Sequence, residues 1–174
     1  CGDTPGARPT GVQQGVRGAG TLAQQRSVVL LENNKGVLPL VARGKRVYLH
    51  RIDSAVAARY GFLVVSDLSQ ADIAIVRTNA PFQTLHPNYV FGAMQHEGSL
   101  EFQNGDKEFE EIKRITAAVP TIVTVYHERP AIMTSLQARV GAMIANFSGS
   151  GAAQRDRLPG VARQGGSDGT EREQ

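Results

Sequence analysis

Apolar residues recur along this chain in short runs that are separated by more polar stretches. Five runs have the length and the nearly continuous apolar character of buried strands: 46–50, 62–65, 73–76, 121–126 and 142–147. Segments with helical spacing or helix caps alternate with them, over 53–59, 68–71, 106–118 and 130–139. This alternation predicts an α/β fold with a mostly parallel sheet and helices on both faces.

One more helix is expected ahead of the first strand. Leu22, Val29 and Leu30 recur at helical spacing and predict a short helix that ends near Asn33, with Gly36 in the exit turn. Capping and breaking residues mark the ends of the later helices: Asp53, Gly61, Asp106 and Pro120.

A long connection interrupts the alternation after the third strand. Residues 78–105 contain no convincing helix or strand, yet they hold aromatic and polar side chains: Phe82, His86, Tyr89, Phe91, His96, Glu97 and Phe102. A loop of this length in a compact domain is usually functional, and ligands of α/β sheets bind where strands end. The composition suits sugar recognition and is equally compatible with a loop that docks on its own domain.

The 174-residue chain carries 19 glycines, and they gather at its two ends. Six lie in residues 1–25 and six in residues 147–174, whereas nearly all aromatic residues lie between these ends. We therefore expect a flexible linker over 1–20, one domain over 21–147 and a disordered or out-of-frame tail over 148–174.

The net charge and the length of the apolar runs limit the classes of partner that we expect. The net charge is only +3 and the basic residues are scattered, so no nucleic acid is expected as a partner. No apolar run approaches the ~20 residues of a membrane-spanning helix, so no membrane span is expected. The single cysteine is residue 1, which fits either a processed bacterial lipoprotein or a fragment of a longer product. Localisation in the cytoplasm or the cell envelope stays open.

Neither a nucleotide motif nor a metal motif emerges. The turn at 50–53 has no glycine, and the Gly149-Ser150-Gly151 segment lacks the third glycine of a dinucleotide loop. His86, His96 and Glu97 could ligate a metal, but their spacing fits no known type of site. We expect no metal and no cofactor.

Several segments resemble one known family. They are 23–33, 36–40 (GVLPL), 44–47, 66–77 (SDLSQADIAIVR), 77–82, 96–102 (HEGSLEF) and 120–131. Together they are similar to the C-terminal α/β domain of family 3 glycoside hydrolases, the group of β-glucosidases, β-xylosidases and N-acetylglucosaminidases. The resemblance covers about residues 22–147. It implies an α/β sandwich that packs beside an N-terminal (β/α)8 barrel, and it places the aspartate nucleophile of a retaining mechanism on that barrel.

The same resemblance suggests site residues in the long loop. Glu97 matches the acid/base glutamate of a Glu-Gly-x-Asp-Arg pattern, but Leu100-Glu101 replaces the Asp-Arg half here. A solvated loop carboxylate is the open alternative for Glu97. Arg77 and His96 are candidates to bind substrate hydroxyls, and loop-fixing hydrogen bonds are their alternative. Asp67 resembles part of the barrel's Ser-Asp motif, yet it follows a strand of the wrong domain, so helix capping is expected of it.

The expected function follows from these assignments. We expect a fragment of a retaining β-glycosidase acting on β-glucosides or related sugars, with this domain completing an active site beside an absent barrel. Its partners would be a β-linked saccharide and that barrel. Family resemblance and apolar periodicity both stop near residue 147, so we expect a frameshift or truncation there and a sheet domain incomplete at its C-terminus. The chain alone should not hydrolyse glycosides. The alternative is a non-catalytic carbohydrate-binding or interaction module, including a lipoprotein tethered through Cys1.

Overall fold

The computed structural model describes residues 27–34, 36–91, 94 and 96–147. The expected linker over 1–20 and the expected tail over 148–174 lie outside the described residues, as does the first part of the helix expected before Asn33.

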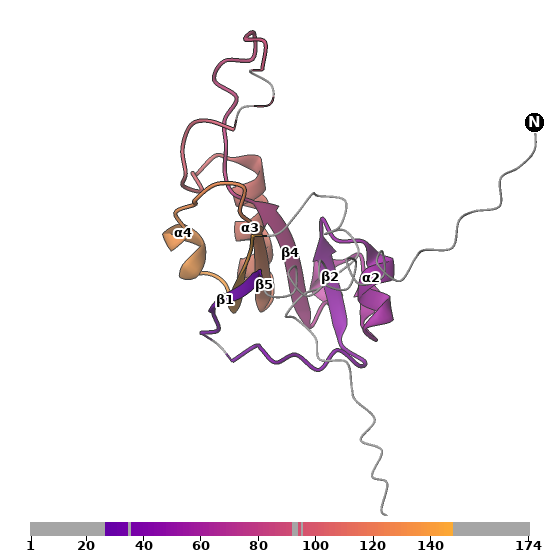
Figure 1. Ribbon diagram of the computed structural model, residues 1–174. Coiled ribbons are helices and arrows are strands. Elements are labelled where there is room, and N and C mark those ends of the chain that lie inside the picture. Colours follow the sequence, from indigo (N-terminus) through magenta and orange to yellow (C-terminus); the bar gives the residue numbers. More distant parts are fainter. Residues whose placement is uncertain (1–26, 35, 92–93, 95, 148–174) are drawn as a thin grey trace, which may run out of the picture.

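The described residues form a six-stranded sheet in the order β1-β6-β5-β4-β2-β3 (Figure 1). Neighbours among β2 to β6 pair in parallel, and β1 pairs antiparallel with β6 at one edge. The strands are β1 (Val28–Glu32), β2 (Arg46–His50), β3 (Leu63–Val65), β4 (Ile73–Asn79), β5 (Thr121–Tyr126) and β6 (Ala142–Asn146). The prediction of a mostly parallel α/β sheet is confirmed.

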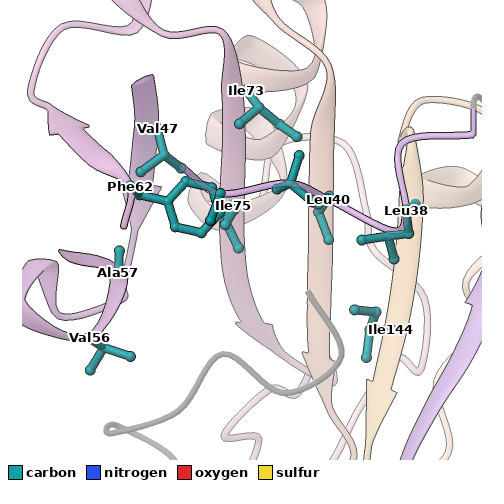
Figure 2. Packing of buried hydrophobic residues seen from close by; sticks show 12 residues of the cluster. Leu38, Leu40, Val47, Val56, Ala57, Phe62, Ile73, Ile75 and Ile144 are labelled. Atoms are coloured by element: carbon teal, nitrogen blue, oxygen red, sulfur yellow. The ribbon is translucent and has the colours of Figure 1, made fainter. Parts of the chain in front are cut away.

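The two faces of the sheet are covered by different elements. Helix α2 (Ser54–Arg59) and the extended segment 37–42 cover one face, where Leu38 and Leu40 lie across the strands (Figure 2). Helices α3 (Lys107–Ala118) and α4 (Thr134–Gln137) and the short 3-10 helix η1 (Leu68–Gln70) cover the other. Helices therefore lie on both faces, as predicted. The central strands β4 and β5 are buried on both sides, which explains their continuous apolar runs.

Two caps that were read from the sequence are confirmed. The Asp53 carboxylate accepts a hydrogen bond from the Ala55 amide at 2.8 Å and begins α2. The Asp67 carboxylate accepts from the Ser69 amide at 2.9 Å and caps η1, so helix capping explains Asp67.

The helix expected to end near Asn33 is wrong in its described part. Residues Val28–Glu32 form strand β1, whose Val28 and Val29 lie opposite Asn146 and Ala145 of β6. Pairing with a neighbouring strand outweighs the weak helical spacing, and β-branched valines favour the strand. The turn expected at Gly36 is present, since Gly36 has φ +59° and its amide donates to the Asn33 carbonyl.

Two further elements differ from the predictions. The strand expected to be buried at 62–65 is the edge strand β3, in which Leu63 is 56% exposed. The helix expected over 130–139 is confined to α4, because the Ile132 amide donates to the Leu100 carbonyl at 2.8 Å and holds that segment extended. Contacts with distant parts of the chain cause both differences.

The long connection between β4 and α3 projects beyond the end of the sheet (Figure 1). It leaves the carboxyl end of β4 and returns through Phe102, which is buried against Phe109 of α3. Strand β4 runs to Asn79, two residues into the connection expected over 78–105; beyond it, as predicted, the described residues of the connection form no named helix or strand.

Candidate functional site

The parallel strands β2, β4, β5 and β6 all end at one edge of the sheet, and the long loop rises from it. We call this the carboxyl edge. Segments 51–53, 80–105 and 127–133 follow strands β2, β4 and β5 there. The order of strands reverses between β2 and β4, because the chain runs from β2 outward to β3 and then returns to the other side of β2. Such a reversal is where open α/β sheets bind ligands.

The base of the long loop is closed by a short antiparallel bridge. The Gln83 amide donates to the Glu97 carbonyl at 2.9 Å, and the Glu97 amide donates to the Gln83 carbonyl at 3.1 Å. Gly98 follows with φ +74°, a conformation that favours glycine. A Cβ atom there would lie 2.2 Å from Gln83 Oε1, so the residue must also be small. The backbone position of Glu97 is therefore fixed on both sides.

Arg129, from the loop after β5, fastens the returning half of the long loop. Its guanidinium donates to the carbonyl of His96, to that of Gly98 at 2.7 Å and to that of Ser99 at 3.1 Å. A planar guanidinium with several N–H groups suits three converging carbonyls. The loop that carries Glu97 is thus tied to the strand β5 that lies at the centre of the sheet.

The Glu97 carboxylate has a defined partner. Its Oε2 atom lies 2.8 Å from Nδ1 of His86, and its side chain is 30% exposed. The His86 ring in turn meets the edge of Tyr89, with ring centroids 5.3 Å apart. The carboxylate is held in one orientation while part of it stays open to solvent. Such a group can exchange a proton with a ligand that approaches the loop.

His96 is held within its own domain. Its Nδ1 atom lies 2.6 Å from Glu128 Oε2, and its ring stacks on Phe82 with centroids 3.9 Å apart. These contacts match the loop-fixing alternative for His96. Its role towards a substrate stays a prediction.

Arg77 lies inside the sheet, in strand β4, rather than on the loop. Alternation along the strand places it on the same face as Ile73 and Ile75, which is the face covered by α2. Partial burial lowers the pKa of its guanidinium. The structure thus places Glu97 and His96 together on the loop and Arg77 in the strand below it.

Sequence reasoning missed a polar cluster at the reversal of strand order. Arg51 follows β2, Thr78 is in β4 and Glu108 is in the first turn of α3. The Arg51 guanidinium lies 2.9 Å from Glu108 Oε2, and His50 Nε2 lies 3.5 Å from Glu108 Oε1. Burial by itself would raise the pKa of Glu108, but the nearby His50 and Thr78 side chains and the charge of Arg51 outweigh this effect and lower the pKa overall. Strand order, which the sequence does not reveal, is the signal that locates this cluster.

No group of three or more His, Cys, Asp or Glu side chains within the described ranges could hold a metal ion. Over the same residues, no helix is long and apolar enough to cross a bilayer.

Comparison with known proteins gives a consistent set of relatives. No family model matches the chain. It is 47% identical over 135 residues to a periplasmic β-glucosidase/β-xylosidase of Dickeya chrysanthemi, which covers 78% of this chain and 20% of that protein. It is 34% identical over 146 residues to β-glucosidase C of Emericella nidulans, covering 83% of this chain and 23% of that protein. The chain thus spans about a fifth of the length of these curated relatives.

Solved structures agree on the fold. The GH3 β-glucosidase of Bifidobacterium adolescentis superimposes with a TM-score of 0.58 at 13% identity, covering 75% of this chain and 24% of that one. At this identity the likeness concerns the fold alone.

Proposed function

The chain is a C-terminal α/β domain of the family 3 glycoside hydrolase type, and from this premise we propose that it completes the active site of a retaining β-glycosidase. The observation that carries the proposal is the 47% identity with a β-glucosidase/β-xylosidase over 135 residues. The proposed substrates are β-glucosides or related β-linked sugars. The proposed hydrolase-like unit is 21–147, with 1–20 as a linker and 148–174 outside it.

The proposed division of labour follows from the chemistry. A retaining glycosidase uses two carboxyl groups about 5–5.5 Å apart, one as nucleophile and one as acid/base. We assign the nucleophile to a (β/α)8 barrel beside this domain and the acid/base role to Glu97. Glu97 would give its proton to the leaving oxygen and then take a proton from the attacking water.

Exposed apolar side chains on the long loop support the proposal that a partner domain packs at the carboxyl edge. Its described outer part exposes large apolar side chains, among which Val90 is 92% and Tyr89 70% exposed. Exposed apolar side chains that gather on one projecting loop are typical of a surface that packs against another domain. The loop would therefore carry Glu97 to the sugar site of the barrel.

His96 and Arg77 take supporting roles in this proposal. His96 lies next to Glu97, and its Nε2 atom is the one that its contact with Glu128 leaves for a sugar hydroxyl. Arg77 stands two residues before the end of β4, where the long loop starts.

A domain exchange tests the proposal. The aligned segment of this chain replaces its counterpart in the Dickeya β-glucosidase/β-xylosidase, and hydrolysis of an aryl β-glucoside is measured. We expect the chimaera to turn over substrate and the 174-residue chain alone to show no hydrolysis, since we assign the nucleophile to the barrel. A folded chimaera without activity, or a chain that hydrolyses the glucoside by itself, would contradict the proposal.

A further inference from the structure

An exposed Asn-Gly dipeptide lies in the turn that leads from the long loop into α3. Of the six asparagines in the chain, only Asn104 is followed by a glycine. The turn is closed by the Asp106 amide, which donates to the Gln103 carbonyl at 3.2 Å. Gly105 has φ +94° and carries no side chain that would hinder its backbone nitrogen from approaching the Asn104 side chain. Such a pair is a candidate for attack of the glycine nitrogen on the asparagine amide.

The Lys113 ammonium lies on the side-chain carbonyl of Asn104. Its Nζ atom donates to Asn104 Oδ1 at 3.0 Å, and it lies 5.2 Å from the centroid of the Phe109 ring. The Lys113 side chain is only 22% exposed, so these contacts hold the ammonium in place. A cation on a carbonyl oxygen stabilises the negative charge that develops there when a nucleophile adds to the carbon. Lys113 is thus placed to activate Cγ of Asn104.

The Glu110 carboxylate contacts the nitrogen that would attack. Its Oε1 atom accepts a hydrogen bond from the Gly105 amide at 2.8 Å and lies 2.7 Å from Lys113 Nζ. The Lys113 side chain and then the Gly105 amide lower the pKa of Glu110, so the carboxylate is ionised at neutral pH and can accept a proton. The attacking amide, a proton acceptor and an activated carbonyl therefore belong to one set of contacts.

The side chain of Asn33 is held in a different way. Its amide nitrogen donates to the Leu38 carbonyl at 2.8 Å, and its Oδ1 atom accepts from the Leu38 amide at 3.1 Å. Its carbonyl thus contacts a neutral amide rather than an ammonium, and the residue that follows it, Asn34, carries a side chain. Asn33 therefore serves as an internal comparison for Asn104.

We propose that the Asn104-Gly105 segment is a self-modification site, at which the chain deamidates through a succinimide with the help of Glu110 and Lys113. The Gly105 nitrogen forms a bond to Cγ of Asn104 and gives its proton to Glu110. Lys113 stabilises the oxyanion that forms on Oδ1. The bond from Cγ to Nδ2 then breaks, and this nitrogen takes the proton from Glu110 and leaves as ammonia. Water opens the ring at either carbonyl, which gives aspartate or isoaspartate at position 104. The net reaction consumes one water, releases one ammonia and involves no oxidation or reduction.

The product changes the junction between the long loop and α3. Hydrolysis adds a negative charge beside Lys113 and Glu110, and isoaspartate also lengthens the backbone by one carbon. This extra carbon lies between Phe102, which is buried in the core, and the first turn of α3. The turn from Gln103 to Asp106 therefore cannot keep its present hydrogen bond in the isoaspartate form. The modification does not depend on the proposed glycosidase function.

Incubation of the full 174-residue chain at neutral pH and physiological temperature tests the proposal. Peptide mapping by mass spectrometry follows the conversion of Asn104 to aspartate and isoaspartate, and we expect Asn33 to stay intact over the same period. Glu110→Gln and Lys113→Met should each slow the conversion about threefold or more, because the proton acceptor or the oxyanion donor is lost. Glu111→Gln and Arg114→Met are the matched controls, since this neighbouring ion pair lies on the same helix and should leave the rate unchanged.

Two results would overturn the proposal. In the first, Glu110→Gln or Lys113→Met converts as fast as the unmodified chain or faster, which would show that these contacts protect the amide rather than assist its loss. In the second, Asn104 stays intact in the folded chain over a period in which it converts in the chain denatured with urea. Preserved dispersion of the amide spectrum in each variant excludes misfolding as the cause of a changed rate.

Discussion

At the scale of single residues, three neighbours determine the position and orientation of Glu97. His86 holds the carboxylate, Arg129 holds the following backbone, and Gly98 permits the turn between them. Neither of the two contacts, that of His86 and that of Arg129, could be read from sequence spacing, since each joins residues whose proximity depends on the folded loop. The residue type of Glu97 and its neighbour Gly98 could be read, because both stand in a short segment that resembles a known family.

Gly98 gives the first prediction. Gly98→Ala places an alanine in the left-handed backbone region and adds a Cβ atom 2.2 Å from the Gln83 side chain. We therefore expect the unfolding free energy to fall by about 1–3 kcal/mol. Urea denaturation measures it. Gly44→Ala is the matched control, because Gly44 has φ +76° and open space around the Cβ position. Equal losses for the two variants would show that the contact with Gln83 contributes nothing.

The Arg46–Asp72 pair gives a second prediction at this scale. Hydrogen bonds from the side chain and then from the backbone amide of Arg46 lower the pKa of Asp72 to about 2. An aspartate in the unfolded chain has a pKa of about 3.9, so the pair stabilises the fold above about pH 4 and loses this effect as the pH falls towards 2. Denaturation measured at each pH should show that the difference in unfolding free energy between the unmodified chain and Asp72→Asn shrinks from pH 4 to pH 2. A difference that stays constant from pH 4 to pH 2 would contradict the assignment, and Arg46→Gln should reproduce the loss.

At the scale of elements, the local sequence pattern determines most helices and strands, whereas contacts with distant residues determine the others. Apolar runs and capping aspartates predicted β2, β4, β5, β6, α2 and α3 close to their observed bounds. The predictions failed at β1 and at the start of α4, where pairing with β6 and with Leu100 determines the conformation. The exposed edge position of β3 also depends on strand order, which no local pattern encodes. The polar cluster of Arg51, Thr78 and Glu108 was missed for the same reason.

Arg129 gives a prediction about the long loop as an element. Arg129→Met removes donors from three carbonyls of the loop, so the bridge between Gln83 and Glu97 should open more often. Hydrogen exchange of the Gln83 and Glu97 amides should accelerate about tenfold or more, while the amides of β5 keep their rates. Arg129→Lys keeps the charge but not the planar fork, so it should restore only part of the protection. Unchanged exchange in both variants would show that the loop is held by other contacts.

At the scale of the whole molecule, the carboxyl edge concentrates the chemistry that the domain offers. The polar cluster of Arg51, Thr78 and Glu108 lies at the switch in strand order, and Glu97 stands on the loop that rises beside it. Core packing occupies both faces of the sheet, and the carboxyl edge is where the proposed ligand and the proposed partner domain would meet this domain. The fold class could be predicted from the sequence. The arrangement of residues at the carboxyl edge could not, because it depends on the strand order.

The central claim is that Glu97 protonates the leaving group when this domain stands beside a barrel. The most direct measurement is kcat/KM of the chimaera on a series of aryl β-glucosides whose leaving phenols differ in pKa. Glu97→Gln should lower kcat/KM about 10²–10⁴-fold for phenols of high pKa and hardly at all for those of low pKa, which leave without protonation. Glu101→Gln, a nearby carboxylate on the same loop, should show no such dependence. A Glu97→Gln chimaera whose kcat/KM is the same fraction of the unmodified value for every leaving group would contradict the claim.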